Sequence, residues 1–409
     1  MRSVRAAGLL VIVLVIAVGC GEPPERGAQA ADLLYFSTGK GVAVVPAGGE
    51  AAPPTTRGVP STDWSSVVTS DPHRLATEVE ARDAITGDTQ WRKAIKGPRL
   101  RVKVVSHEAR MVALTPLYQQ HYTTGRTATT LVVAGSDVEP RTIELDGNYE
   151  PEAFSTDGNS VFLLEYLPPQ APTSYRVRRL DLATEKVEGV YSVDAELQEA
   201  MRGTARVQAM SPNGKFLYTL YTTGGGNLGP RRAFVHVLNL DELWAHCIDL
   251  PADFGQAREP QIAINVTPDS KRLYVTDSAS AAIAEVDTES LEVLQTKTTA
   301  LLTSQYTPIA AHDGRHTLYV AQGPFVYPVD TRDMVAGDRW ALDGAISGVQ
   351  VSADATKLYA SVAGKLVTID VTTGAERRVD TPPGVGRITE VGRVMQRIED
   401  PLRKLTCAC

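Results

Sequence analysis

Tyrosine and arginine side chains gather in three long polar segments of the chain, residues 116–127, 166–174 and 222–232. Both residue types are enriched in binding hot spots, because tyrosine gives a rigid amphipathic surface and arginine gives a planar set of donors for carboxylates. We therefore expect these segments to bind an acidic or polar partner surface; drift in tolerated surface loops is the alternative. The candidate binding residues are Tyr118, His121, Tyr122, Arg126, Tyr166, Arg231 and Arg232.

The histidines and the glycine-rich run do not indicate a metal or cofactor site. His312 and His316 have the spacing of two ligands on a helix, but they flank Asp313-Gly314, which predicts a turn between strands. Residues 223–231 are rich in glycine but lack the Lys-Ser/Thr continuation of a phosphate-binding loop. We expect neither a metal nor a cofactor, and we assign no catalytic residue.

Cys20 ends an N-terminal segment that has the pattern of an export signal. Two arginines precede an uncharged, mostly aliphatic run over residues 6–18, which is shorter than the roughly 18 to 20 residues that span a bilayer. The tetrapeptide Ala-Val-Gly-Cys at 17–20 resembles the bacterial lipobox. This resemblance implies export, cleavage before Cys20 and diacylation of its thiol; an ordinary secretory peptide is the alternative.

This reading divides the N-terminus into a signal peptide over residues 1–19 and a flexible tether over residues 20–32. The tether has no apolar periodicity, as is typical of linkers. We expect the folded body to lie on the extracytoplasmic face of the cell membrane, anchored through lipid on Cys20.

Three further cysteines, Cys247, Cys407 and Cys409, leave an odd number of thiols in an exported chain. Two of them belong to a C-terminal tail over residues 392–409, which is long enough to fold back along the body. We expect a disulfide between Cys247 and either Cys407 or Cys409. Free thiols, and a small ring closed between the two tail cysteines, are the alternatives.

Most of the remaining chain repeats one pattern of short strands and turns. Its clearest copy, residues 266–294, holds a Pro-Asp-Ser turn, strands over 272–277 and 283–286, and an outer strand that begins near residue 292. A sheet this small cannot bury both of its faces alone, so copies must stack. Eight copies, 32 to 56 residues apart, align at Tyr35, Val67, Val112, Phe162, Tyr218, Tyr274, Tyr319 and Tyr359.

A period of roughly 45 residues with four strands per copy predicts an all-β fold, a single β-propeller of four-stranded blades. The segments Tyr-Val-Thr-Asp at 274–277 and Tyr-Val-Ala-Gln at 319–322 resemble the YVTN-type repeat of exported, WD40-like propellers. The resemblance covers residues 33–391. The repeat count predicts eight blades, and the short first interval leaves seven open.

The first copy has only two clear strands, residues 34–37 and 42–45. We expect residues 386–391 to supply its missing inner strand, so that both ends of the chain share one blade. Such closure removes the unpaired strand edges that an open ring would expose.

Two sets of recurring residues are expected to serve the fold. Tryptophans at the start of fourth strands should pack between blades, since a repeated position implies a repeated contact: Trp91, Trp244 and Trp340. Acids or amides after third strands should accept hydrogen bonds from backbone N–H groups in the next turn: Asp83, Asp181, Asn239, Asp287, Asp330 and Asp370.

Composition and fold together favour a binding protein. With 41 basic and 48 acidic residues and no Lys/Arg run in its body, the chain has no electrostatic footprint for nucleic acid. We expect a binding or scaffold module for an envelope protein, peptide or glycan. Propellers similar to this one include lactonases and quinoprotein subunits, so an enzyme using Glu150, Glu152 or Glu259 at inner-strand ends is the first alternative. A purely structural envelope component is the second.

Overall fold

The computed structural model describes residues 32–38, 41–46, 58–193, 196, 200–224, 229–257, 261–299, 308–379 and 388–396. Apart from the short 3-10 turns η1 (His107–Ala109) and η2 (Tyr122–Thr124), every regular element in these residues is a β-strand. The predicted all-β class is confirmed. No helix in the described part of the chain has the length and apolar composition needed to cross a bilayer. The expected signal peptide, Cys20 and the tether up to residue 31 lie outside the described residues.

The strands form eight antiparallel sheets, which we number by their place in the chain. Sheets 1 to 4 contain β1 (Asp32–Thr38), β2 (Gly41–Pro46) and β32 (Ile388–Gln396); β3 (Val59–Pro60), β4 (Ser66–Pro72), β5 (Ala76–Asp83) and β6 (Thr89–Lys96); β7 (Leu100–Val105), β8 (Met111–Pro116), β9 (Ala128–Gly135) and β10 (Arg141–Asp146); and β11 (Tyr149–Phe154), β12 (Ser160–Leu167), β13 (Ser174–Asp181) and β14 (Val187–Gly189).

Sheets 5 to 8 continue the same order. They contain β15 (Thr204–Met210), β16 (Phe216–Thr223), β17 (Arg232–Asn239) and β18 (Trp244–Asp249); β19 (Ile262–Val266), β20 (Arg272–Asp277), β21 (Ala282–Asp287) and β22 (Val293–Thr298); β23 (Ile309–His312), β24 (Thr317–Gln322), β25 (Phe325–Asp330), β26 (Val335–Ala336) and β27 (Trp340–Ala341); and β28 (Ile346–Val351), β29 (Lys357–Val362), β30 (Lys365–Asp370) and β31 (Glu376–Arg378).

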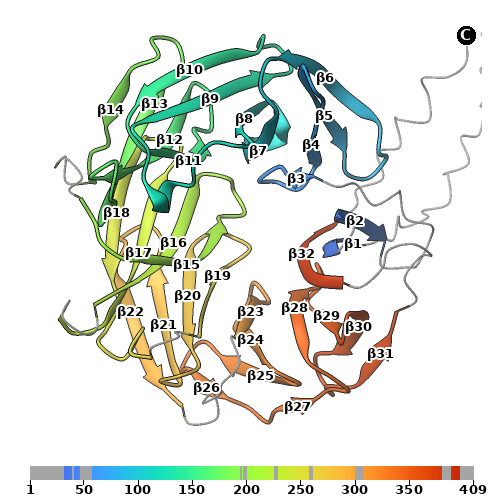
Figure 1. Ribbon diagram of the computed structural model, residues 1–409. Helices are drawn as coiled ribbons and strands as arrows, with labels where there is room; N and C mark the ends of the chain where they lie inside the picture. The colour runs from blue at the N-terminus through green and yellow to red at the C-terminus, as the bar shows by residue number, and fades with distance from the viewer. Residues whose placement is uncertain are drawn as a thin grey trace, which may run out of the picture. The chain divides into compact units, whose positions relative to one another are not determined.

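Each sheet from 2 to 8 is a meander whose strands pair in chain order, as the repeat predicts. Figure 1 shows the sheets following one another in the same order as the chain. This arrangement is consistent with a β-propeller. Sheets 2 to 8 each have a turn end, where the first strand turns into the second, and a loop end, where the second strand turns into the third. In sheet 1 the inner strand is the C-terminal β32, so its loop end is the connection between β1 and β2.

Neighbouring sheets pack face to face because both faces of the central strands are apolar. On β20, Leu273 and Val275 pack against sheet 5, whereas Tyr274, which points the other way, packs against sheet 7. The expected role of the tryptophans is confirmed for Trp91, which packs in the apolar cluster between sheets 2 and 3 and donates its indole N–H to Ala109 O at 2.8 Å. Burying two faces of each sheet makes the sheets depend on one another for stability.

A repeated side-chain hydrogen bond closes the turn ends. In sheet 5 the hydroxyl of Ser211 donates to Asn213 Oδ1 at 2.6 Å and accepts from the backbone N–H of Phe216 at 2.9 Å. The same arrangement recurs at Ser61, Ser155, Thr267 and Ser352. The predicted caps after third strands are also confirmed, at Asp83, Asp181, Asn239, Asp287, Asp330 and Asp370.

The first sheet is built from both ends of the chain. The strand β1 pairs with β2 on one side and with the C-terminal β32 on the other, from Asp32 opposite Gln396 to Thr38 opposite Ile388. The expected strand over 386–391 is therefore present, although β32 runs on to Gln396, past the expected boundary with the tail. The hydroxyl of Tyr359 donates to Asp32 Oδ2 at 2.9 Å, which ties sheet 8 to sheet 1.

Candidate binding face

Three of the eight loop ends are longer than the others. Residues 117–127, 168–173 and 224–231 join the second and third strands of sheets 3, 4 and 5, whereas residues 323–324 and 363–364 suffice in sheets 7 and 8. These are the segments in which the sequence places the candidate binding residues. We call this side of sheets 3 to 5 the loop face.

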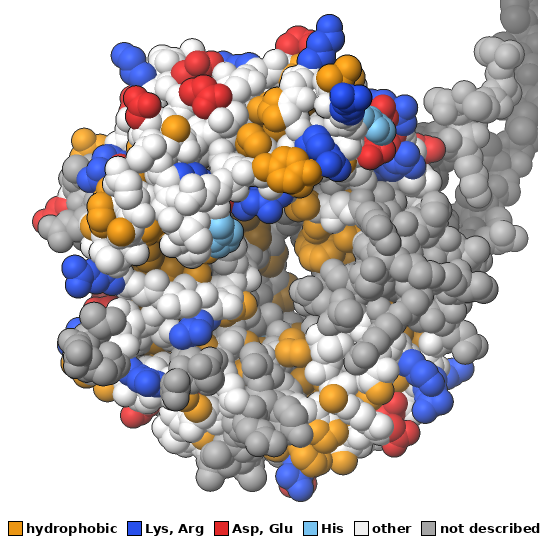
Figure 2. Space-filling model, in the orientation of Figure 1, with side chains coloured by type: hydrophobic (Ala, Val, Ile, Leu, Met, Phe, Trp, Pro, Cys, Tyr) orange, Lys and Arg blue, Asp and Glu red, His pale blue; other side chains and the backbone are white. Residues whose placement is uncertain are grey.

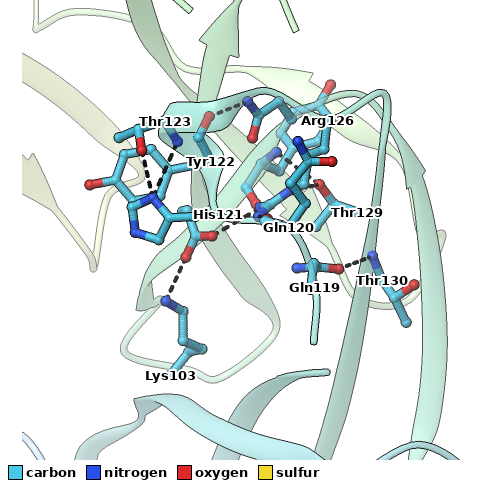
Figure 3. A network of polar contacts seen from close by, with 12 residues as sticks. Lys103, Gln119, Gln120, His121, Tyr122, Thr123, Arg126, Thr129 and Thr130 are labelled. Atoms are coloured by element: carbon cyan, nitrogen blue, oxygen red, sulfur yellow. Dashed lines mark hydrogen bonds and ion pairs between the residues drawn. The ribbon is translucent and has the colours of Figure 1, made fainter. Parts of the chain in front are cut away.

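Arg126 fixes the first loop from inside (Figure 3). Its side chain is 5% exposed and forms an ion pair with Glu150 at 3.0 Å. Its other donors reach Gln120 O at 2.7 Å, Thr129 Oγ1 at 3.0 Å and the backbone oxygen of Tyr149. Lys103 forms a second ion pair with Glu150 at 2.7 Å. All three guanidinium nitrogens of Arg126 are thus hydrogen-bonded within the fold, so this side chain positions the loop and is not exposed to a partner.

The first loop also packs directly on the second. The backbone N–H of Arg126 donates to Pro169 O at 2.9 Å, and the Asn148 amide donates to both Tyr122 O and Pro169 O. Gly125 has a φ of 79°, and a Cβ at this position would lie 2.0 Å from Gln170 O. Only glycine satisfies both constraints, so the two loops form one continuous surface.

Aromatic rings connect this surface to the interior. Tyr122 stacks on Tyr166 with ring centroids 4.4 Å apart, and the exposed ring of His121 lies 4.3 Å from Tyr122. The row continues through Tyr175 to the buried Tyr221. Burial raises the pKa of Tyr166 far above its usual value, so its hydroxyl stays protonated. The structure thus brings His121, Tyr122 and Tyr166 together, as one stack that crosses from sheet 3 to sheet 4.

Tyr118 stands apart from this stack and projects into solvent. It is 80% exposed, and its hydroxyl accepts a hydrogen bond from Arg99 at 3.0 Å. The Arg99 guanidinium lies 6.0 Å from the ring centroid, which holds the ring in place by a cation–π contact. A large, oriented and exposed ring of this kind is suited to contact with another molecule.

Arg231 and Arg232 follow the third loop but lie in different surroundings. Arg232 is exposed at the start of β17, whereas Arg231 lines a cavity of about 580 Å³ with Arg202, Arg206 and several threonines. We call this the arginine cavity. The side chain of Arg206 donates to Thr222 Oγ1 at 2.7 Å, and Arg231 donates to the backbone oxygen of Gln256 at 3.2 Å. None of the described lining residues is acidic.

Arg206 also lines a second, central cavity of about 640 Å³ between the inner strands of sheets 5 to 8. Figure 2 shows a hollow at the centre of the sheets, with blue and red side chains scattered around it. Gln208 on its wall donates to Glu152 Oε1 at 3.1 Å, and Glu152 Oε2 is buried with no partner in the described part of the chain. Burial raises the pKa of Glu152 to about 7, against hydrogen bonds from Gln208 and Thr219 that lower it.

Other residues singled out from the sequence have structural surroundings or lie outside the described residues. His312 stacks on Tyr274 at 5.2 Å and accepts a hydrogen bond from the backbone N–H of Gly314, as a turn residue does. Cys247 lies beside Met201, with 3.5 Å between the sulfur atoms, and burial raises the pKa of its thiol to about 12. Its expected partners, Cys407 and Cys409, lie outside the described residues, as does Glu259, so the disulfide stays a prediction that non-reducing peptide mapping can test.

Sequence reasoning missed Arg202 and Arg206. They precede and open an inner strand with no unusual composition, and they are far from Arg231 along the chain. Only the pairing of β15 with β16, and of β16 with β17, brings these positions to one end of sheet 5. A prediction of the strand register could have found Arg206. It lies on β15 near the end of β16, and Arg231 directly precedes β17, which pairs with the same end of β16.

No protein-family model matches the chain, and no curated protein matches it. Among solved structures, the chain is similar to the dihydro-heme d1 dehydrogenase NirN in complex with DHE, with a TM-score of 0.52 and 13% identity over 89% of this chain and 75% of that one. A putative 6-phosphogluconolactonase from Bacteroides uniformis gives a TM-score of 0.43 and 14% identity over 90% and 99%. These neighbours are β-propeller-like proteins. The similarity to NirN supports the propeller fold and, at this identity, nothing about activity.

Proposed function

We propose that this chain is a lipid-anchored, extracytoplasmic β-propeller whose loop face binds an acidic or polar surface of an envelope protein, peptide or glycan. The observation that carries the proposal is the arginine cavity beside the joined loops, where three guanidinium groups without an ion pair to a described residue line one hollow and can donate to an acidic group. Exposed Tyr118 and the edge of the aromatic stack add contact area next to it.

Partner capture by the full-length protein tests this proposal. A variant carrying Tyr118→Ala, Tyr122→Ala, Arg231→Ala and Arg232→Ala should lose a partner that the wild-type chain cross-links in the envelope. The matched control is Arg332→Ala, which removes an exposed arginine at a turn end. If the quadruple variant folds and keeps every partner with unchanged affinity, the site lies elsewhere.

The finer architecture belongs to the same proposal: eight blades, with the ring closed by β1 and β32. The pairing of these strands and the Tyr359–Asp32 hydrogen bond support closure. Deleting residues 386–409 should then destabilise the whole body, because sheet 1 loses an inner strand on which its neighbours pack. A truncated chain that melts at the temperature of the full chain would show that the ring does not depend on this strand.

The membrane anchor rests on the lipobox-like motif at Cys20. Mass spectrometry of membrane-extracted protein should find a mature N-terminus at a diacylated Cys20, and Cys20→Ala should release the body into the soluble fraction. An unmodified cysteine, or a start well downstream of it, would remove the anchor from the proposal.

An enzyme acting at the central cavity is the second candidate, favoured by one observation. Glu152 combines a raised pKa with a position behind the cavity wall, and carboxyl groups of this kind act as general acids or bases near neutral pH. Hydrolysis of a panel of lactones by the full chain tests it. Turnover that Glu152→Gln abolishes would favour the enzyme, and turnover that this variant retains would exclude Glu152 from the chemistry.

A further inference from the structure

The arginine cavity gathers positive charge that the described fold does not neutralise. Arg202, Arg206 and Arg231 line it, and none of the three forms an ion pair with a described residue. The chain as a whole has a formal net charge of -7, so this concentration of cationic groups runs against the average of the molecule. Like charges held in one cavity repel one another, and an anion would relieve that repulsion.

The donors in this cavity are already partly oriented. Arg206 is tied through Nε to Thr222 Oγ1, and a terminal nitrogen of Arg231 is tied to Gln256 O, while the Gln256 amide donates back to Arg231 O at 2.8 Å. The remaining guanidinium N–H groups have no partner among the described residues and can donate to a ligand. Threonine hydroxyls at 173, 204 and 223 add neutral donors around them.

A cavity at the turn ends of sheets 6 and 7 shows the contrast. It has a volume of about 360 Å³ and also contains arginines, but Arg272 pairs with Glu285 at 3.1 Å and with Asp287 at 2.5 Å. Arg332 pairs with Asp330. Those two guanidinium groups are neutralised within the fold, and the carboxylates Asp269 and Glu285 line the same cavity beside Lys271 and Arg315. That cavity therefore presents mixed charge to an anion, whereas no described residue that lines the arginine cavity is acidic.

We propose that the arginine cavity binds the phosphoryl group of a small phosphate monoester. This inference goes beyond the proposed binding of an envelope protein, peptide or glycan, because it assigns a small ligand to one cavity of the loop face. One planar guanidinium is enough to pair with a carboxylate, whereas three guanidinium groups with several hydroxyl donors suit a tetrahedral group that has three terminal oxygens and two negative charges. The volume of about 580 Å³ leaves room for the organic part of the ligand.

The organic part can extend toward the centre of the sheets. Arg206 lines both the arginine cavity and the central cavity, so a ligand held through its phosphoryl group reaches the mouth of the central cavity. The phosphoryl group can come from a soluble phosphate monoester or from a lipid headgroup. Both sources present the same group to the same donors.

Titration calorimetry on the full-length protein at fixed ionic strength tests the inference, with inorganic phosphate and glycerol 3-phosphate as probes and citrate as the carboxylate comparison. Both phosphates should bind, and more tightly than citrate. Arg206→Gln and Arg231→Gln should each weaken phosphate binding about tenfold or more, the loss of one charge-assisted contact. The matched control is Arg332→Gln, an exposed arginine at a turn end that pairs with Asp330, which should bind as the wild-type chain does.

Each other result overturns the inference. Absence of phosphate binding does so, as does citrate binding as tight as phosphate, or an equal loss in Arg231→Gln and Arg332→Gln, which would show only general attraction to positive charge. Flotation with phosphatidylcholine vesicles, with and without phosphatidic acid, assigns the source: selective binding of Cys20→Ala protein to the acidic vesicles indicates a lipid headgroup, and its absence indicates a soluble ligand. Loss of partner capture in the quadruple variant without phosphate binding would leave the proposed function standing and this inference refuted.

Discussion

Arginine has opposite surroundings at the two ends of the sheets. At the turn end of sheet 6, Arg272 lies between Glu285 and Asp287, and the turn itself is closed by hydroxyl and carboxylate hydrogen bonds. At the loop end of sheet 5, the described partners of Arg206 and Arg231 are a hydroxyl and a carbonyl, and neither is a carboxylate. The fold neutralises Arg272 at its turn end and leaves these two arginines of the loop face without a described counter-ion. A charged side chain without a counter-ion in the described fold therefore indicates function more reliably than a charged side chain that the fold already pairs.

The largest effect on stability is expected at Arg126. This residue is the exception to the comparison, because it lies on the loop face and is paired within the fold. Arg126→Ala leaves Glu150 buried with Lys103 as its remaining charged partner, which should cost about 3 kcal/mol of unfolding free energy. Chemical denaturation measures the loss. Arg332→Ala, which breaks an exposed pair, should leave stability unchanged. Equal losses in the two variants would mean that burial does not distinguish them.

The second largest effect on stability is expected at Glu152, and this effect depends on pH. Its pKa in the folded state is about 7, above the ordinary value of 4.5, so the folded chain holds a proton that the unfolded chain has released. Both states are protonated below pH 4.5 and no penalty applies there. Stability is lost as the pH rises from about 4.5 to about 7, where the loss is complete, by an amount on the order of 2 kcal/mol after allowance for partial exposure.

The variant Glu152→Gln isolates this contribution. It should match the wild-type chain at about pH 4 and be more stable at about pH 8, because a neutral amide does not ionise. Denaturation curves at both pH values provide the measurement. If the difference between the two proteins is the same at both pH values, the Glu152 carboxyl does not titrate in this range.

The variant Ser211→Ala tests the same comparison at the turn end of sheet 5. The buried Ser211 hydroxyl joins Asn213 to the N–H of Phe216, so its removal should cost about 1 kcal/mol. Phosphate affinity should stay the same, because the lost contacts are at the far end of sheet 5. A variant that loses phosphate binding while it keeps its stability would reverse the roles assigned to the two ends.

Arg231→Gln should show the smallest effect on stability. A side chain whose fold contact is a single hydrogen bond at 3.2 Å to a carbonyl should change the unfolding free energy by no more than about 0.5 kcal/mol. Thermal melting without phosphate measures this change, and melting with phosphate should separate the variant from the wild-type chain. A large destabilisation without ligand would assign Arg231 to the fold.

The fold was predictable because its signals are local and repeated. The short apolar run at residues 273–275, and an acid or amide after most third strands, specify strands and turns without knowledge of distant residues. Even the pairing of the C-terminal strand with β1 follows from counting strands in the first copy. The last residues of β32 escaped prediction, because the pairing with β1 shifts register between Leu34 and Phe36.

The candidate site was predictable only by region. The long loops and their tyrosines and arginines mark the loop face, but residue type alone does not separate Arg126, which is buried and fully bonded, from Arg231, which lines a cavity. That distinction depends on Glu150 and on Gly125, whose importance appears only when the loops of two sheets are packed together. Arg206 likewise becomes part of a site only once three strands are in register.

The pairing of β1 with β32 also determines how the protein responds to mechanical force. The chain enters β1 at Asp32 and leaves β32 at Gln396, and these two residues are partners at the same end of the sheet. A force that pulls the two chain ends apart therefore acts on one backbone pair at a time and separates the strands in sequence from one end. It does not load all the hydrogen bonds between them at once, as a shearing force would. Tension between the N-terminal segment and anything attached to the C-terminal tail would open sheet 1 at low force, before the other sheets bear any of it.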